Sequence, residues 1–106
     1  MSNSKNLYPE LRLVFGFAEG CHWCDRFKTQ TLPMIKALKI RYQILTEEKH
    51  LLAYKADDYG YPLIVICKAD GSPLKYHGGF LTLAELMKKI DKIYGKYYPN
   101  GNKNPN

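Results

Sequence analysis

Two cysteines stand three positions apart in the segment Cys21-His22-Trp23-Cys24. The residues before this segment predict a buried strand and those after it predict a helix, so the pair lies at a helix N-terminus. There the helix dipole and free backbone N–H groups favour the thiolate of Cys21, the form that attacks in disulfide exchange. His22 adds a nearby cation when it is protonated. This spacing and position predict a redox-active dithiol that can close into a small disulfide ring.

Zinc binding is the alternative role for this cysteine pair. A tetrahedral zinc site needs four ligands, which usually come from two paired motifs. The remaining candidates are Cys67, His50 and His77, and none of them is paired. Cys67 also lies within an apolar strand, where a free cysteine behaves as an inert core residue. We therefore expect a redox centre and no metal site.

The elements that must position the dithiol follow the order β-α-β-α-β-β-α. Strands are predicted by short apolar or alternating runs and helices by apolar spacing of three and four residues. The expected strands cover residues 11–17, 40–45, 63–67 and 74–77, and the helices cover residues 21–39, 46–57 and 82–94. A right-handed crossover makes the first two strands parallel, which predicts an α/β fold with a four-stranded mixed sheet and helices on both faces.

Several local signals support these assignments. Ile40, Tyr42 and Ile44 alternate with polar residues, which indicates a half-buried strand. Thr46 is a suitable N-cap for the helix that follows, and Pro33 is expected to break or kink the first helical region. Residues 69–73 form the turn of a hairpin. The last helix is the most clearly marked, since Thr82 and Glu85 match a capping box.

The composition fits one small folded domain. The chain has 106 residues, of which 45% are hydrophobic and 25% charged. These values exclude a disordered chain and a disulfide-stapled miniprotein. We divide the chain into a lead-in (residues 1–10), a domain (11–94) and a disordered, asparagine-rich tail (95–106).

Charge and hydropathy narrow the partners and the compartment. The net charge of +6 is spread evenly along the sequence, without the basic block that marks a nucleic-acid-binding protein. We expect only a mild bias toward acidic partners and no nucleic acid. No run of about 18 apolar residues exists, so no membrane association is expected. The N-terminus lacks the apolar region of a signal peptide, which makes a reducing cytoplasm the expected location.

With the dithiol placed, residues 11–94 resemble the thioredoxin-like superfamily. Three features carry the resemblance, in the family's order and at its distances: the turn into Cys21-x-x-Cys24, the Tyr61-Pro62 pair before a strong strand, and Gly78-Gly79 before the last helix. The resemblance implies that Cys21 is the attacking cysteine and Cys24 the resolving one.

The resemblance also implies a substrate-binding surface beside the dithiol. Pro62 is expected to be cis and to face the cysteines, and a cis X-Pro bond exposes the backbone of the residue before it. The N–H and C=O of Tyr61 could then pair with an extended substrate strand. We also assign substrate contact to His22 and Trp23, and to the glycine pair Gly78-Gly79.

The chain departs from typical thioredoxins at two places. Gly20 precedes the first cysteine where thioredoxins have Trp, and Phe15 occupies the position of the buried Asp six residues before that cysteine. The usual proton acceptor for Cys24 is therefore missing. Glu19, His22 and water are the alternatives for this task.

Glutaredoxins offer the second comparison, because the predicted core is as short as theirs. Asp70-Gly71-Ser72 followed by Gly78-Gly79-Phe80 resembles their glutathione site, although Cys-Pro-Tyr-Cys and the acid after the glycine pair are absent. Extended relatives with a Cys-x-Trp-Cys turn and a late helix proline, as at Pro33, form a third branch.

Three functions follow from these comparisons. The first is a thiol–disulfide oxidoreductase that reduces protein disulfides through Cys21 and Cys24, needs no organic cofactor and receives electrons from a thioredoxin-type reductase. The second is a glutaredoxin-like enzyme with glutathione as electron donor. The third is a non-catalytic binding module whose docking face contains Trp23 and Tyr61, an analogy that rests on fold alone.

Overall fold

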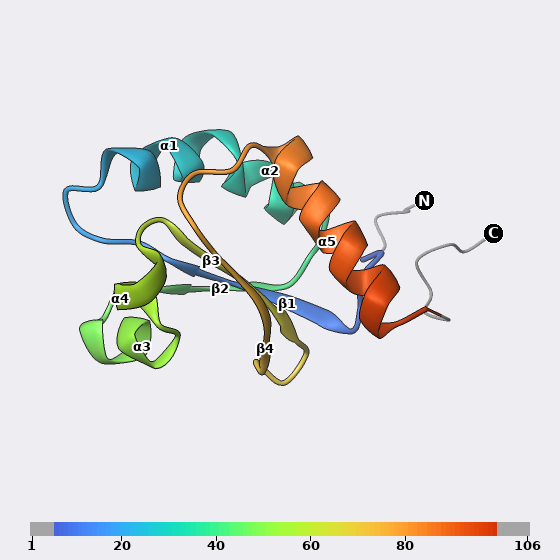
Figure 1. The fold of residues 1–106 in the computed structure, drawn as a ribbon. Coiled ribbons are helices and arrows are strands. Elements are labelled where there is room, and N and C mark those ends of the chain that lie inside the picture. Colours follow the sequence, from blue (N-terminus) through green and yellow to red (C-terminus); the bar gives the residue numbers. More distant parts are fainter. Residues whose placement is uncertain (1–5, 100–106) are drawn as a thin grey trace.

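A computed structural model describes residues 6–99, which form one sheet with helices on both of its faces (Figure 1). The elements in chain order are β1 (Leu11–Gly16), α1 (His22–Gln30), α2 (Leu32–Ala37), β2 (Tyr42–Leu45), α3 (Glu48–Ala53), α4 (Ala56–Tyr59), β3 (Leu63–Lys68), β4 (Pro73–Gly78) and α5 (Leu83–Tyr97).

The sheet has four strands in the order β2-β1-β3-β4. β1 and β2 are parallel, whereas β3 runs antiparallel to β1 and β4 antiparallel to β3. The predicted mixed sheet and its parallel first pair are confirmed. Gly16, at the end of β1, lies opposite Leu63, at the start of β3. This register brings the loop after β1 and the residues before β3 to the same end of the two central strands.

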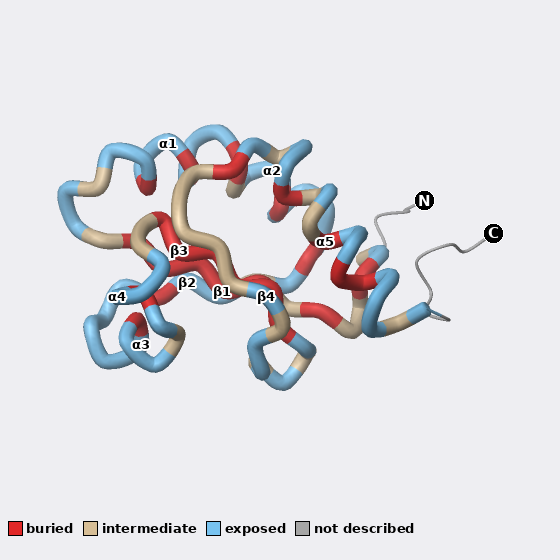
Figure 2. The backbone as a smooth tube through the Cα atoms, viewed as in Figure 1, coloured by how far each residue is buried: buried red, intermediate tan, exposed pale blue. Residues whose placement is uncertain are grey.

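Two hydrophobic cores lie on opposite faces of the sheet (Figure 2). Successive side chains of a strand point to opposite faces. Phe15 of β1 and Ile64 of β3 therefore pack under α1, α2 and α5, whereas Val14 and Val65 pack against α3 and α4. The central strands β1 and β3 are covered on both faces, which explains why they read as nearly continuous apolar runs. The predicted covering of both faces is confirmed.

The first predicted helical region consists of two helices. The break between them lies one residue earlier in the sequence than Pro33 by itself predicts. Thr31 ends α1 and also precedes α2, and its side chain is buried with the hydroxyl donating to the Leu81 carbonyl at 2.8 Å. Pro33 then sits in the first turn of α2, where its missing N–H costs no hydrogen bond. A tertiary hydrogen bond thus fixes the corner between the two helices.

The second helical region also differs from its prediction. Lys55 adopts the left-handed conformation (φ 63°) and divides the predicted helix into α3 and α4. The N-cap of α3 is Glu47, with no side-chain hydrogen bond, so the predicted cap at Thr46 is wrong.

β2 departs from the predicted alternation. Ile40 is buried before the strand begins, and Ile44 is 41% exposed while Leu45 is buried. β2 is an edge strand with a neighbouring strand on one side only, and its Ile44 side chain is left partly exposed. Alternation in the sequence therefore overstated the burial of this strand.

The C-terminal helix extends three residues past the predicted domain boundary at residue 94. Tyr94 is buried, and its hydroxyl donates to Glu10 Oε1 at 2.6 Å. Tyr8 packs edge-on against the Tyr94 ring and donates to Asp91 Oδ1 at 2.7 Å. The end of the predicted lead-in is therefore part of the domain, because α5 needs these residues to cover its last turns. Residues 1–5 and 100–106, with most of the predicted tail, lie outside the described residues.

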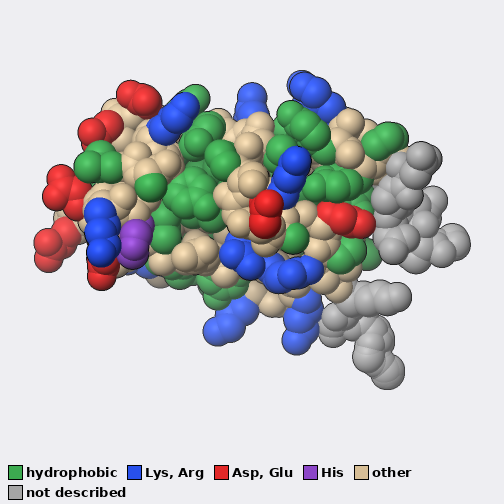
Figure 3. Space-filling view, turned by 90° about the horizontal axis from the view of Figure 1, so that it is seen from below, with side chains coloured by type: hydrophobic (Ala, Val, Ile, Leu, Met, Phe, Trp, Pro, Cys, Tyr) green, Lys and Arg blue, Asp and Glu red, His purple; other side chains and the backbone are tan. Residues whose placement is uncertain are grey.

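Charges that are evenly spread along the sequence are less evenly spread in space. Seen from below, Asp and Glu side chains gather at the end where α3 and α4 lie (Figure 3). The first turns of these helices contribute Glu48, Asp57 and Asp58. None of the helices within residues 6–99 has the length and apolarity needed to cross a membrane.

Candidate active site

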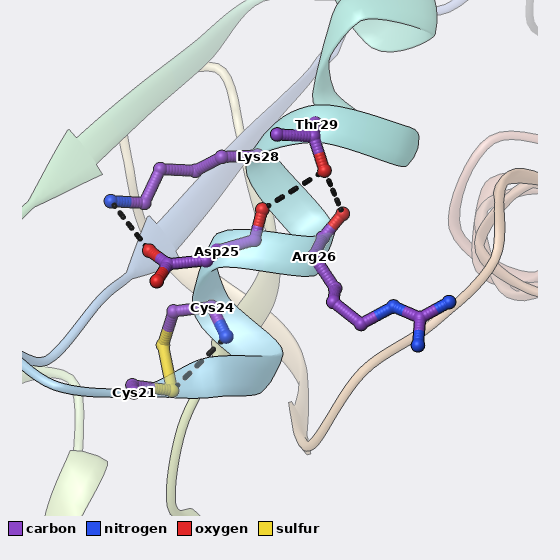
Figure 4. Close-up of polar contacts among 6 residues, drawn as sticks. All are labelled: Cys21, Cys24, Asp25, Arg26, Lys28 and Thr29. Carbon is purple, nitrogen blue, oxygen red and sulfur yellow. Dashed lines mark hydrogen bonds and ion pairs between the residues drawn. A yellow bond between two sulfur atoms is a disulfide. The ribbon is translucent and has the colours of Figure 1, made fainter.

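The cysteine pair closes a disulfide at the N-terminus of α1 (Figure 4). The chain leaves β1 and turns at Gly20, whose φ of 73° suits a residue without a Cβ. Cys21 follows as the N-cap of α1, and its Sγ accepts a hydrogen bond from the Cys24 N–H at 3.1 Å. The two Cα atoms are 5.2 Å apart. The predicted placement of the pair at a helix start is confirmed.

The two cysteines differ in exposure, a difference that suits two different chemical tasks. Cys24 is fully buried in the core beside Phe27, whereas Cys21 is only partly covered. An incoming disulfide can therefore reach the Cys21 sulfur but not that of Cys24. In the reduced protein, the Cys24 N–H and the positive end of α1 are placed to stabilise a thiolate on Cys21. The geometry suits an attacking cysteine followed by a resolving one.

The Tyr61–Pro62 peptide bond is cis, as the resemblance implied. Pro62 is buried, and its carbonyl accepts a hydrogen bond from the Gly79 N–H at 2.9 Å. No backbone hydrogen bond within residues 6–99 uses the N–H or the C=O of Tyr61. The antiparallel pairing of β1 with β3 holds this loop at the same end of the central strands as the disulfide turn. The Tyr61 backbone is thus free to pair with another chain.

A groove of about 480 Å³ lies beside the disulfide turn. Its lining comes from three separate parts of the chain: Trp23, Tyr61, Gly79, Phe80, Thr82 and Glu85. We call this the disulfide groove. The Trp23 side chain is 49% exposed, and its ring centre lies 5.6 Å from that of Phe80. The centre of the His22 ring lies 5.4 Å from that of the Trp23 ring, with the two rings edge to face.

Phe80 is a groove residue that the sequence analysis named only within the glutaredoxin-like glycine turn and did not assign to substrate contact. Its ring bridges the exposed Trp23 and the buried Phe27, at 5.6 and 6.4 Å between ring centres. The sequence signal for a role of Phe80 in the groove was an aromatic residue in a predicted loop, between a glycine pair and a helix N-cap. Such a residue has no strand or helix face to assign it to the core, so its neighbours become evident only from the tertiary structure.

The glycine pair has two different roles. Gly79 lines the disulfide groove with a φ of 116°, a backbone conformation that favours glycine. Gly78 does not line it. A Cβ on Gly78 would overlap the backbone carbonyl of Tyr59, at the end of α4. Gly78 is therefore required by the close passage of two backbone segments, whereas Gly79 lines the disulfide groove.

The N-terminus of α5 closes one end of the disulfide groove and carries its own carboxylate. Thr82 Oγ1 accepts from the Glu85 N–H at 3.2 Å, and Glu85 Oε1 accepts from the Thr82 N–H at 3.0 Å. The predicted capping box is confirmed. This helix end is where the resemblance to glutaredoxins would place the glutathione carboxylate. The Glu85 carboxylate already satisfies one of its N–H groups and would repel such an anion.

The other part of the predicted glutathione site lies elsewhere. Residues 70–72 form the turn between β3 and β4, and the Gly71 carbonyl accepts from the Tyr54 hydroxyl at 2.8 Å. This turn follows the last residue of β3, whereas Pro62 and the glycine pair meet at its first residue. Six-residue strands separate the two ends. The predicted joint contribution of these segments to one site is wrong, because an antiparallel hairpin places its turn opposite its open end.

An aromatic cluster occupies the site of the missing buried acid. Phe15 is fully buried, with its ring centre 4.9 Å from that of Phe27. Thr31 is the buried polar residue of the described chain, so no carboxylate lies in this core. Glu19 and His22 are both exposed. The proton acceptor for Cys24 stays a prediction among Glu19, His22 and water.

The remaining cysteine and histidines lie away from the dithiol. Cys67 is a buried free thiol in the core against α3 and α4, and burial raises its pKa to about 12. Burial and the nearby Lys89 lower the pKa of His77. His50 is exposed, with its Nδ1 3.7 Å from a Glu47 carboxylate oxygen. Within residues 6–99, no three His, Cys, Asp or Glu side chains gather where they could hold a metal ion.

Three charged side chains of α1, those of Asp25, Arg26 and Lys28, follow the disulfide turn (Figure 4). The Arg26 guanidinium lies 5.4 Å from the centre of the Trp23 ring, an arrangement that holds the indole in place. Lys28 and Asp25 form an exposed ion pair at 3.7 Å, which contributes little to stability.

Comparison with known proteins establishes the fold class. No family model matches the sequence, and a search of curated proteins finds no significant match. Among solved structures, a malaria parasite thioredoxin-2, described as a component of protein secretion machinery, is similar with a TM-score of 0.59 and 22% identity, over 78% of this chain and 82% of that chain.

Two further structures agree with this match. Thioredoxin from Fasciola hepatica has a TM-score of 0.60 and 20% identity, with 84% of this chain and 83% of that chain covered. The C-terminal domain of DsbD from Neisseria meningitidis has a TM-score of 0.60 and 17% identity, with 78% and 80% covered. The chain has a thioredoxin-like fold. This fold together with the Cys21–Cys24 disulfide supports a function of the thiol–disulfide oxidoreductase kind.

Proposed function

We propose that this protein reduces disulfides of other proteins by dithiol exchange through Cys21 and Cys24. The observation that carries the proposal is the disulfide at the start of α1, with one sulfur accessible and the other buried. The disulfide groove beside it, with the unpaired backbone of Tyr61, offers a place for the substrate chain. Exposed aromatic rings such as Trp23 are frequent anchors in protein interfaces.

The reaction takes place in two exchange steps. The Cys21 thiolate attacks one sulfur of the substrate disulfide, forms a mixed disulfide and releases the other substrate sulfur as a thiolate. Cys24 then loses its proton and attacks the Cys21 sulfur. This step closes the Cys21–Cys24 disulfide and releases the second substrate sulfur. Two electrons have moved from the protein dithiol to the substrate, and no organic cofactor is needed.

The oxidised protein must then be reduced by a second partner. A thioredoxin-type reductase is the donor we propose, and glutathione is the alternative. Two glutathione thiols would supply the two electrons and leave as glutathione disulfide. The Glu85 carboxylate at the N-terminus of α5 weighs against a glutathione site there. A cytoplasmic location stays a prediction. A redox potential of the Cys21–Cys24 pair well above that of the cytosolic glutathione pool would count against it.

The first experiment measures disulfide reduction by the pre-reduced protein, with insulin as substrate. We expect Cys21→Ser to abolish the reaction and Cys67→Ala, the matched control at the buried thiol, to retain it. Cys24→Ser should accumulate a mixed disulfide between Cys21 and the substrate, detectable by mass spectrometry. Unchanged reduction by Cys21→Ser would refute the proposal.

The binding-module alternative predicts a different result. A partner that binds the Cys21→Ser, Cys24→Ser double variant with full affinity, while the native protein reduces no disulfide, would make the fold a docking domain. Equilibration in glutathione buffers then fixes the direction of the reaction. A potential near about −270 mV indicates a reductant, and one near about −120 mV an oxidant.

A further inference from the structure

A second groove, of about 520 Å³, lies between β4 and the C-terminal half of α5. Four lysines line it: Lys75 from β4, and Lys89, Lys92 and Lys96 from α5. Its other lining residues are apolar or aromatic: Leu74, Ile93 and Tyr97. We call this the lysine groove, and the mechanism proposed above does not use it.

The lysines of this groove lack acidic partners within the described chain. The α5 lysines are spaced three and four residues apart, so they follow one face of the helix and repel one another. The two ion pairs within residues 6–99 involve α1 and α3, not these lysines. No carboxylate is among the residues that line the lysine groove. An anionic occupant would relieve this repulsion.

The groove wall combines charge with apolar surface. Ile93 is nearly buried, Leu74 is partly covered, and Tyr97 is 42% exposed. The Lys96 ammonium lies 5.6 Å from the centre of the Tyr97 ring. A polypeptide with acidic and apolar side chains matches both kinds of surface. A single-stranded nucleic acid would need a series of stacking aromatic rings, and among the residues that line this groove Tyr97 is the one aromatic.

The lysine groove and the disulfide groove each share lining residues with a third hollow. A hollow of about 360 Å³ between them is lined by Leu81, Glu85, Lys88, Lys89 and Lys92. It shares Glu85 with the disulfide groove, and Lys89 and Lys92 with the lysine groove. From Glu85 to Lys96 the helix rises about 17 Å, a distance that five or six extended residues span. α5 thus contributes lining residues to all three hollows, from Glu85 in the disulfide groove to Lys96 in the lysine groove.

We propose that the lysine groove binds an acidic segment of the same protein whose disulfide is reduced at Cys21. This inference rests on the proposed function and specifies its substrate class: a disulfide accompanied, a short distance along the chain or in space, by an acidic stretch with apolar residues. The acidic stretch holds the substrate along α5 while its disulfide meets Cys21. The remaining basic charge of the protein guides approach but does not give this positioning.

The test uses synthetic peptides with one disulfide, a short Gly-Ser spacer and six flanking residues, either all glutamate or all glutamine. The flank is placed on either side of the disulfide, so that chain direction does not decide the result. The pre-reduced full chain reacts in a single turnover, and the rate constant is measured at low and high salt. The groove variant carries Lys89→Gln, Lys92→Gln and Lys96→Gln. The control variant removes equal charge from other elements: Lys36→Gln, Lys49→Gln and Lys68→Gln.

We expect the glutamate peptide to react about tenfold faster than the glutamine peptide with the native protein, since several exposed charge pairs each contribute modestly. The groove variant should lose this preference and the control variant should keep it. High salt should reduce it. Equal rates for the two peptides, or a preference that survives in the groove variant, would overturn the inference.

Binding of a redox-inert peptide separates this inference from the proposed function. A fluorescent glutamate peptide with serines in place of its cysteines reports binding by anisotropy, independently of exchange. Binding that is lost in the groove variant supports the groove even if no peptide is reduced. Tighter lysine-dependent binding of an oligonucleotide or of anionic vesicles would overturn the assignment to a protein. Concentration-dependent self-association through the acidic end of a second copy would do so as well.

Discussion

Gly78→Ala tests whether Gly78 is required by packing rather than by substrate. The added Cβ would come closer than 3.0 Å to the Tyr59 carbonyl, a separation that a Cβ essentially never shows. The obstacle is backbone on both sides, so relief requires β4 or the end of α4 to move. Overpacking in folded proteins costs about 1–3 kcal/mol, and a rigid obstacle places this site at the upper end, about 2–3 kcal/mol. For a domain of this size, such a loss lowers the Tm by about 10 to 20 °C.

The assay is urea unfolding of the oxidised protein, followed by circular dichroism, together with a thermal scan. Gly95→Ala is the matched control, because Gly95 lies within α5 and its added Cβ meets no atom within 4 Å. Alanine is favoured over glycine in a helix, so this variant should gain about 0.5–1 kcal/mol. The two substitutions therefore predict opposite shifts of the urea midpoint. A Gly78→Ala protein as stable as the native one would refute the packing argument.

Three further predictions concern other parts of the molecule. Because Cys67 is fully buried and burial raises its pKa to about 12, iodoacetamide at pH 8 should modify Cys21 of the reduced native protein and leave Cys67 unmodified until urea is added; mass spectrometry that locates a modification on Cys67 in the native protein contradicts this. Burial and Lys89 lower the folded pKa of His77, so its contribution to stability is present above the unfolded pKa of about 6.5 and is lost as the pH falls toward the folded value. Urea midpoints at pH 7 and pH 5 should differ less in His77→Gln than in the native protein, and an equal difference would exclude His77 as a cause. Tyr8→Phe removes the 2.7 Å hydrogen bond to Asp91 and should cost about 1–2 kcal/mol in urea unfolding, whereas an unchanged midpoint would show that the bond adds no stability.

Features that depend on residues close in sequence could be predicted. The dithiol, its place at a helix start and the capping box of α5 each involve residues three positions apart, and the helix itself brings such residues together. The two central strands were also evident, because burial on both faces demands continuous apolar residues. The cis bond before Pro62 was expected only through resemblance, since an isolated Tyr-Pro pair favours trans.

Features that depend on packing between distant segments were missed or misplaced. Ile44 has the alternation of a covered strand, yet its side chain on the edge strand β2 is 41% exposed. The break between α1 and α2 depends on a hydrogen bond from Thr31 to Leu81, across the fold. α5 continues past Gly95 because Tyr94 finds partners at the other end of the chain.

The sequence by itself determined the chemistry of this protein: which atoms exchange, and the helix terminus that favours the exchange. Only the tertiary structure decided what surrounds that chemistry. Trp23, Tyr61 and Phe80 line one groove because β1 pairs with β3 and β3 with β4. Lys75 joins the lysines of α5 because the edge strand lies beneath that helix. Residues close together in the sequence determine which groups react. Sheet register and helix packing determine which surfaces those groups share with a binding partner.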